Sequence, residues 1–163
     1  KAVGVEVRGE MQTDGITLFG TADRVDQDKD GQLTIVDYKS GGAPSASSAA
    51  AGLDNQLGLL GLLAREGHMK GVGANAIAAL EYWSLAPKRD RAGEGTITNT
   101  YGSRSTLKSA EQAVDHAADI LSDLAARYLL GTEAFEPGAN AKYGDYDQLM
   151  RRDEWFGRED VDA

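Results

Sequence analysis

The chain has 163 residues, a length that fits one folded domain with a substantial core. It has no cysteine and only two histidines, which excludes disulfides and disfavours zinc, so we expect any metal to be held by oxygen. The formal net charge of −9 disfavours nucleic-acid binding by a basic surface alone. Because we find no membrane-length apolar run and no secretory signal, we predict a cytoplasmic protein without a membrane partner. A strand-like pattern begins almost at once, and we expect a fragment of a longer protein.

Alternating apolar and polar residues predict three strands in the first quarter of the chain, at residues 3–12, 16–26 and 33–39. The dipeptides Asp14-Gly15 and Asp30-Gly31 between these strands are typical of tight hairpin turns. The sequence therefore predicts an antiparallel N-terminal meander.

The rest of the chain alternates helical and strand-like patterns. Residues 43–52 are rich in Ser and Ala and indicate a mobile connection or a frayed helix start. Apolar spacing then predicts a helix at 53–66, strands at 74–86 and 96–101, and a long helix at 106–130 with Thr106 as its N-cap. This order predicts an α/β fold with a mixed β-sheet flanked by helices. From Phe135 the tail is irregular, with aromatic anchors at Tyr143, Tyr146, Trp155 and Phe156.

Two carboxylates and an amine are predicted to converge on the meander. If strands 16–26 and 33–39 pair across the turn near 29–31, Asp23 lies within one position of facing Asp37, and Lys39 shares the face of Asp37. Two like charges so close together repel, and a divalent cation would relieve the repulsion. The metal would polarise a phosphoryl oxygen and activate water, while Lys39 would orient that water or stabilise phosphate charge. The pattern indicates phosphodiester hydrolysis.

These residues stand in two longer motifs, GTADRVD at 20–26 and IVDYKSG at 35–41. They resemble the PD-(D/E)XK nuclease superfamily in its RecB/AddB-like branch, which carries a G-x-x-D-R-(I/V)-D strand followed by a D-Y-K strand. The resemblance implies a restriction-endonuclease-like core, with Asp23 and Asp37 as ligands of Mg²⁺ or Mn²⁺ and Lys39 as the catalytic lysine. A Gln-Leu helix follows in that branch and matches Gln56-Leu57, which implies that Gln56 contacts the site or DNA. Leu60 stands where the helix motif has tyrosine.

The tail carries a second resemblance, to the iron–sulfur segment of AddB-type subunits. Gly144, Met150 and Ala141 occupy positions where that segment has cysteines, so no iron–sulfur cluster is expected in this chain. We therefore divide the chain into a nuclease core at 1–134, which lacks the upstream helical part and its ligand histidine, and a cluster-free tail at 135–163.

The resemblance implies a DNA nuclease within a helicase–nuclease complex that processes double-strand break ends for recombinational repair. It also implies an AddA-type helicase–nuclease subunit as partner and single-stranded DNA delivered by the helicase. The isolated fragment would have little or no activity.

Two other functions fit the same residues. Because the upstream histidine is missing, a nuclease-fold module that lost activity and serves DNA binding or complex assembly remains an alternative. The spacing Asp26-x-Asp28-x-Asp30-Gly31, with Asp37 eleven residues after Asp26, also resembles the start of a calcium-binding EF-hand loop. An EF-hand needs a helix on each side, so this hypothesis depends on whether residues 16–25 form a strand or a helix.

Several of the singled-out residues also have a purely structural interpretation. We interpret Arg24 and Asp26 as an ion pair that braces the hairpin. Gln56 can equally be a residue of the helix surface. His68 and His116, isolated from other ligand types, are interpreted as surface residues.

Overall fold

The computed structural model describes residues 1–85 and 96–135. By its contacts the chain divides into one compact unit, Lys1–Gly131, and a second, Thr132–Ala163, of which residues 132–135 are described. The loop at 88–95 and the aromatic anchors and cysteine-replacing positions of the tail lie outside the described residues. The predictions made for those segments therefore stay predictions.

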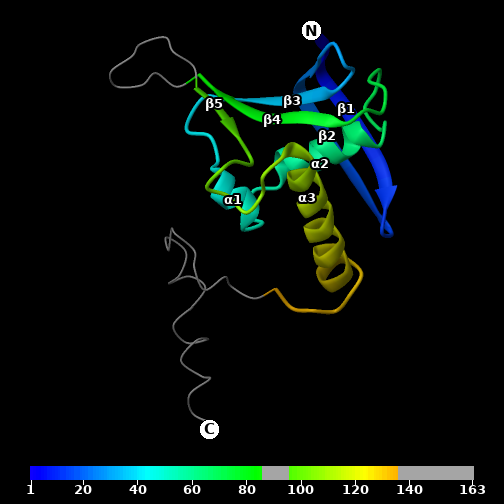
Figure 1. Cartoon of the computed structure of the whole chain (residues 1–163). Helices are drawn as coiled ribbons and strands as arrows, with labels where there is room; N and C mark the ends of the chain where they lie inside the picture. The colour runs from blue at the N-terminus through cyan, green and yellow to red at the C-terminus, as the bar shows by residue number, and fades with distance from the viewer. Residues whose placement is uncertain (86–95, 136–163) are drawn as a thin grey trace. The chain divides into compact units, whose positions relative to one another are not determined.

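The first unit is built on a five-stranded sheet with the strand order β1-β2-β3-β4-β5. The strands are β1 (Ala2–Thr13), β2 (Ile16–Gln27), β3 (Leu33–Lys39), β4 (Ile77–Ser84) and β5 (Thr96–Asn99). β3 and β4 pair in parallel, and the other neighbours are antiparallel. This confirms the predicted mixed sheet with an antiparallel N-terminal meander (Figure 1).

Both hairpin turns of the meander form where the Asp-Gly dipeptides predict them. Asp14 and Gly15 have φ values of 49° and 78°, the left-handed conformation that a two-residue hairpin turn requires. In the second turn the Asp28 carboxylate accepts hydrogen bonds from the backbone N–H groups of Asp30 and Gln32, at 2.9 and 2.8 Å.

The EF-hand hypothesis is wrong. Residues 16–27 form β2, and an EF-hand needs a helix there. The acidic residues of the supposed calcium loop instead organise a β-turn, because a short Asp side chain readily bonds backbone amides two residues further on. Within this segment Asp28 therefore stabilises the turn, and Asp26 pairs with Arg24.

The helices of the described chain lie on one face of the sheet (Figure 1). They are α1 (Ala46–Ala50), α2 (Gln56–Arg65) and α3 (Ala110–Leu124), and α3 continues as a π-helical turn, η1 (Ala125–Leu129). The segment predicted as a mobile connection or frayed helix start contains the short helix α1, capped by the Ser45 side chain, which accepts a hydrogen bond from the N–H of Ser48.

Two helix starts differ from the prediction. α2 begins at Gln56, and Leu53, predicted in its apolar stripe, is 83% exposed. α3 begins at Ala110, because the Ser109 hydroxyl caps it by accepting from the N–H of Gln112. Thr106 is therefore not the N-cap. Leu107, predicted on the helix face, is buried from the segment that precedes the helix.

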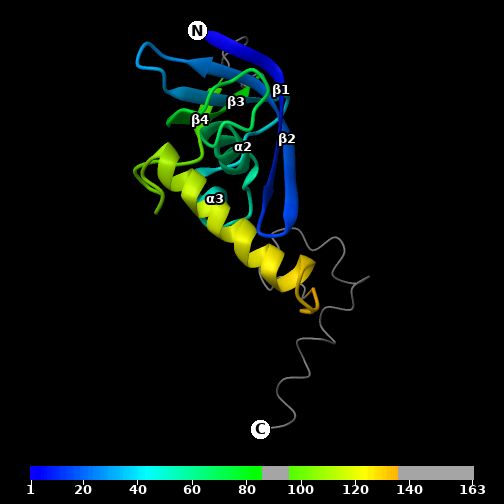
Figure 2. The same ribbon diagram turned by 90° about the vertical axis from the view of Figure 1, so that its right-hand side faces the viewer.

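The core lies between the sheet and α2, which is buried along most of its length. Glycines on α2 allow α3 to approach closely: a Cβ atom on Gly58 would lie 2.5 Å from the Cβ of Ala117. The β1–β2 hairpin extends beside α3 (Figure 2), and at its tip the Ser122 hydroxyl donates to the Asp14 carboxylate at 2.6 Å. Helix α2 is thus packed between the strands and α3.

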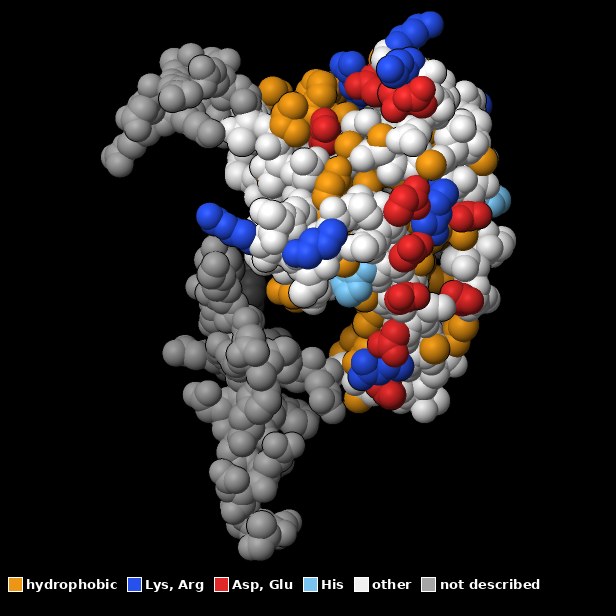
Figure 3. Space-filling view, in the orientation of Figure 1, with side chains coloured by type: hydrophobic (Ala, Val, Ile, Leu, Met, Phe, Trp, Pro, Cys, Tyr) orange, Lys and Arg blue, Asp and Glu red, His pale blue; other side chains and the backbone are white. Residues whose placement is uncertain are grey.

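The outer side of α3 is acidic. Its residues at four-residue spacing, Glu111, Asp115, Asp119 and Asp123, follow one line along the helix. Acidic side chains gather over this helix in the space-filling view (Figure 3). Arg65 of α2 bonds to Glu111 and Asp115 at 2.9 and 2.7 Å, and these carboxylates raise the pKa of its guanidinium against the opposing effect of burial. The helices of the described residues include no candidate for a membrane-spanning segment.

Candidate active site

Asp37 is the buried centre of the polar cluster at the carboxyl end of β3. Only 5% of its surface is exposed. It continues the face of the strand that carries Leu33 and Ile35, two residues of the apolar core. Burying a carboxylate is costly unless charged or hydrogen-bonding groups compensate it. Its Oδ1 accepts a hydrogen bond of 2.7 Å from the Gln56 amide nitrogen, and its buried Oδ2 forms an ion pair with the Lys39 ammonium.

Lys39 and Gln56 complete a closed triangle with Asp37. The Lys39 ammonium lies 2.8 Å from Asp37 Oδ2 and donates to the Gln56 carbonyl oxygen at 3.1 Å. Gln56, the first residue of α2, therefore bonds with both ends of its amide, one to the acid and one to the amine. The strand places Asp37 and Lys39 on one face because strand side chains alternate. The structure thus brings the Lys39 amine and the Gln56 amide together at the Asp37 carboxylate.

Asp23 lies where β2 and β3 part. The ladder between these strands has the predicted register and ends at the pair Arg24–Val36, one position before Asp23 and Asp37. Instead of pairing with Asp37 as a ladder partner, Asp23 accepts a hydrogen bond of 2.8 Å from the backbone N–H of Tyr38, through its Oδ2. That amide nitrogen is covalently bonded to the carbonyl carbon of Asp37. The second acid thus sits beside the backbone of the first.

Tyr82 and Asp54 belong to the same neighbourhood, and the sequence reading missed both. Tyr82 is the parallel partner of Asp37 on β4 and is fully buried. Its hydroxyl donates to the two carboxylate oxygens of Asp54 at 3.0 and 2.9 Å, and its ring centre lies 5.1 Å from the Lys39 ammonium. Burial raises the pKa of Tyr82 well above the ordinary tyrosine value, and the charges of Asp54 and Asp37 raise it further. The phenol therefore stays protonated and donates.

Arg24 and Asp26 lie apart from this centre. The Arg24 Nε donates to both carboxylate oxygens of Asp26 at 3.0 Å, which confirms the predicted ion pair. The Arg24 guanidinium lies 5.2 Å from the ring centre of Trp83, whose ring also packs edge-on against Tyr38. Hydrogen bonds to Asp26 and Tyr38 raise the pKa of Arg24. These contacts are typical of a residue that stabilises the hairpin, as the structural interpretation predicted.

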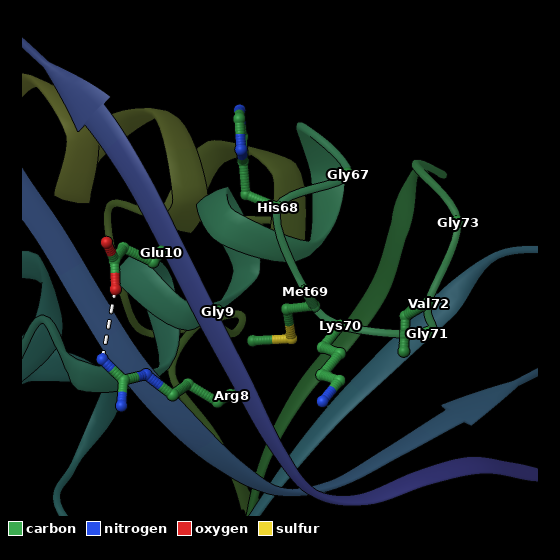
Figure 4. A pocket seen from close by; sticks show the side chains of 10 residues that line it. All are labelled: Arg8, Gly9, Glu10, Gly67, His68, Met69, Lys70, Gly71, Val72 and Gly73. Carbon is green, nitrogen blue, oxygen red and sulfur yellow. Dashed lines mark hydrogen bonds and ion pairs between the residues drawn. The ribbon is translucent and has the colours of Figure 1, made fainter.

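The remaining singled-out residues are not at the site. His68 is exposed, and His116 contacts the Ala50 carbonyl oxygen at 3.2 Å. His68 borders an open hollow at the edge of the sheet, lined by Arg8, Gly9 and Glu10 of β1 and by residues 67–73 (Figure 4). Arg8 and Glu10 pair with each other there at 3.1 Å. None of Asp23, Asp37, Lys39 and Gln56 lines this hollow.

The mixed sheet, with its antiparallel entry strands and its helices, is the α/β architecture of restriction endonucleases. The family model described as the PD-(D/E)XK nuclease superfamily matches residues 1–147. The chain therefore belongs to the PD-(D/E)XK nuclease superfamily. No curated protein and no solved structure matches the chain.

Nucleases of this superfamily generally use a divalent metal ion such as Mg²⁺, and the acidic residues fit such an ion. Mg²⁺ is usually bound by one or two carboxylates and keeps water or phosphate oxygens as its other ligands. Asp23 and Asp37 offer two carboxylates, and their charges are offset in part by the Lys39 ammonium, 2.8 Å from Asp37 Oδ2. Among the described residues no three His, Asp or Glu side chains converge on one point. The donors therefore suit a partly hydrated hard cation better than an all-protein cage.

Proposed function

We propose that this chain is a metal-dependent DNA nuclease core in which Asp23 and Asp37 hold the metal and Lys39 and Gln56 serve the reacting phosphate. The observation that carries the proposal is the closed triangle of Asp37, Lys39 and Gln56, with distances of 2.7, 2.8 and 3.1 Å. A buried acid, an amine and an amide held this tightly on an otherwise apolar face are costly for folding alone. Their cost is explained if they perform chemistry.

Each residue has a defined task in this proposal. When bound, a divalent ion supplies charge to a phosphoryl oxygen and lowers the pKa of water. Lys39 places a positive charge beside Asp37, where the negative charge of a phosphodiester increases during hydrolysis. Gln56 fixes both partners, since its amide can bond Asp37 and Lys39 together only in one orientation. The tight triangle keeps the amine from swinging into solvent.

We further propose that the domain belongs to the RecB/AddB-like branch and works in a helicase–nuclease complex at double-strand break ends. The motifs at 20–26 and 35–41 support this assignment. The charge supports a need for a partner: a net charge of −9 and the acidic line along α3 repel a free polyanion. A basic AddA-type partner that feeds single-stranded DNA to the site would overcome this repulsion.

The test is cleavage of end-labelled single-stranded DNA by the protein, alone and together with an AddA-type partner, in Mn²⁺ or Mg²⁺, for the wild type and for Lys39→Ala. Removal of a preorganised charge-stabilising group typically slows a reaction by about a hundredfold or more, so we expect cutting to fall at least that far. Lys29→Ala is the matched control, because Lys29 is an exposed lysine of the 28–32 turn. Circular dichroism shows whether the fold persists. Equal cutting by Lys39→Ala and wild type would overturn the assignment.

A second candidate function is a nuclease-fold module without catalysis, which binds DNA or braces a complex. It is favoured because, in the described part of the chain, no third His, Asp or Glu side chain converges with Asp23 and Asp37 on one point. The same assay separates the two functions. A wild-type protein that binds DNA but does not cut it in either metal supports the module.

A further inference from the structure

The centre contains a buried group to which the proposed chemistry gives no task, the Tyr82 hydroxyl. Tyr82 is fully buried beside Asp37, on the neighbouring parallel strand. A buried tyrosine hydroxyl needs a partner, and here that partner is a carboxylate at 2.9 and 3.0 Å rather than a backbone carbonyl. The choice of Asp54 as acceptor needs a reason.

Asp54 stands two residues before Gln56, in the segment that leads into α2. The helix start is not secured by its own cap: Asn55, the N-cap residue, makes no side-chain capping hydrogen bond and instead donates to the Gly52 carbonyl oxygen. The bond between Tyr82 and Asp54 therefore ties the start of α2 to β4. A charge-assisted bond of this kind is stronger than a neutral one.

The same ring restrains the amine. Among the described residues, the Lys39 ammonium contacts the carboxylate of Asp37, the carbonyl oxygen of Gln56 and the ring of Tyr82, whose centre is 5.1 Å away. An ammonium over an aromatic face is attracted by the negative charge density of the ring. Tyr82 thus touches the triangle from two directions, through the helix that carries Gln56 and through the amine itself.

We infer that Tyr82, acting through Asp54, is a positioning residue that holds Gln56 and Lys39 against Asp37. The inference rests on the proposed function for its effect on cleavage, but its geometric part does not. The hydroxyl bond fixes the helix start, and the ring supports the ammonium. Without the hydroxyl, the start of α2 is no longer tied to β4, and Gln56 can move. If Gln56 moves, Asp37 Oδ1 loses its only described hydrogen-bond donor.

Four variants test the inference. Tyr82→Phe keeps the ring and removes the bond, and Asp54→Ala removes the same bond from the other side. Asp54→Asn keeps an acceptor oxygen, so it should restore the behaviour of the wild type. Tyr101→Phe is the matched control, because it removes another tyrosine hydroxyl bond, to the Ala78 carbonyl oxygen at 3.4 Å, without touching Asp37, Lys39 or Gln56.

The first readout is the side-chain amide signal of Gln56 in the ¹H–¹⁵N spectrum, which needs no activity. In Tyr82→Phe and Asp54→Ala we expect this signal to move toward the position of a free glutamine, and in Asp54→Asn and Tyr101→Phe to stay. The second readout is cleavage, where we expect kcat to fall by about ten- to a hundredfold with little change in KM, as misplacement of a catalytic group does. The double variant Tyr82→Phe/Asp54→Ala should be no slower than either single one.

The two proposals fail in different ways. An unmoved Gln56 signal in Tyr82→Phe overturns the positioning role, whatever happens to cleavage. A moved signal with unchanged kcat in a protein that cuts DNA overturns it as well. If the wild-type protein does not cut, the proposed function is at fault, and the Gln56 signal still decides whether Tyr82 positions this residue.

Discussion

The Asp23 carboxylate accepts a hydrogen bond of 2.8 Å from the backbone N–H of Tyr38, directly beyond the last paired residues of β2 and β3. The side chain thereby takes the place of a strand partner for that amide. One oxygen of the acid is committed to the fold, and the carboxylate is held next to Asp37 by a backbone contact. The residue proposed as a metal ligand thus also has a structural role, and substitution can separate the two.

Asp23→Asn and Asp23→Ala should separate these roles. An asparagine carbonyl oxygen can still accept from the Tyr38 N–H, so we expect Asp23→Asn to unfold at nearly the wild-type temperature while losing metal-dependent cutting. Asp23→Ala leaves the amide without its acceptor and should lose about 1 kcal/mol of stability as well. Thermal unfolding and cleavage assays on both variants check this. An active Asp23→Asn would show that the negative charge is not needed.

Addition of Mg²⁺ or Mn²⁺ should stabilise the folded protein, because a ligand that binds only the native state raises its stability. At a free metal concentration of about one hundred times Kd, the gain is about 2.7 kcal/mol. We expect a higher melting temperature with metal than with EDTA, and no such difference in Asp37→Asn. Asp30→Asn, in the exposed turn, is the control and should respond like the wild type. A metal response that survives in Asp37→Asn would place the ion elsewhere.

The packing of α2 against α3 predicts a strong effect from one added methyl group. A Cβ on Gly58 would lie 2.5 Å from the Ala117 Cβ and 2.9 Å from the Ala113 carbonyl oxygen. Alanine favours a helix more than glycine does, but overpacking typically costs about 1–3 kcal/mol, so we expect Gly58→Ala to destabilise the fold. Gly42→Ala, where a Cβ meets nothing within 4 Å, is the control. Urea unfolding of both variants measures the difference, and a stabilised Gly58→Ala would contradict the close packing.

Stability should fall in alkali because of two tyrosines. Burial raises the pKa of Tyr82 and of Tyr101, with neighbouring acids adding to the effect. Below about pH 10, the ordinary tyrosine pKa, both states keep their protons and stability is unaffected. Above it the unfolded chain loses protons that the native state retains, so the free energy of unfolding decreases as pH rises. For Tyr82 the slope is at most about 1.4 kcal/mol per pH unit.

Urea unfolding between pH 8 and 11 measures this slope. Tyr82→Phe should flatten it more than Tyr101→Phe, since Tyr82 is the more deeply buried and lies beside two acids. A slope that is the same in Tyr82→Phe and wild type would show that the phenol ionises as easily in the fold as in the unfolded chain.

The meander could be predicted from the sequence because its signals are local. Alternation marked the strands, and the turn near Asp30-Gly31 set the register, so the ladder between β2 and β3 has the predicted pairs. Asp37 and Lys39 followed from this register and from the alternation of side chains. Gln56 was predicted from the resemblance of its helix motif, and in the structure its amide bonds to Asp37 and Lys39.

The other features depend on contacts that sequence spacing does not encode. α1 has no apolar periodicity, and its capping serine resembles the serines around it. Thr106 and Ser109 are both residues that often cap helices. In the structure Ser109 is the cap, and Leu107 is buried in the segment before the helix. The bond between Tyr82 and Asp54 joins a strand to a loop 28 positions away, which only the folded chain brings together.

The parallel pairing of β3 with β4 has a consequence for the order in which the centre becomes competent. The acids, the amine and the amide all come from the continuous stretch 23–56, whose hairpin and helix close over short loops. Tyr82 arrives only when β4 crosses over the intervening helix and docks beside β3, a long-range step that is slow to form. A chain still emerging from the ribosome, or one that has partly opened, therefore carries the acidic groups without their brace. We expect Gln56 and Lys39 to be held firmly against Asp37 only after β4 has docked beside β3.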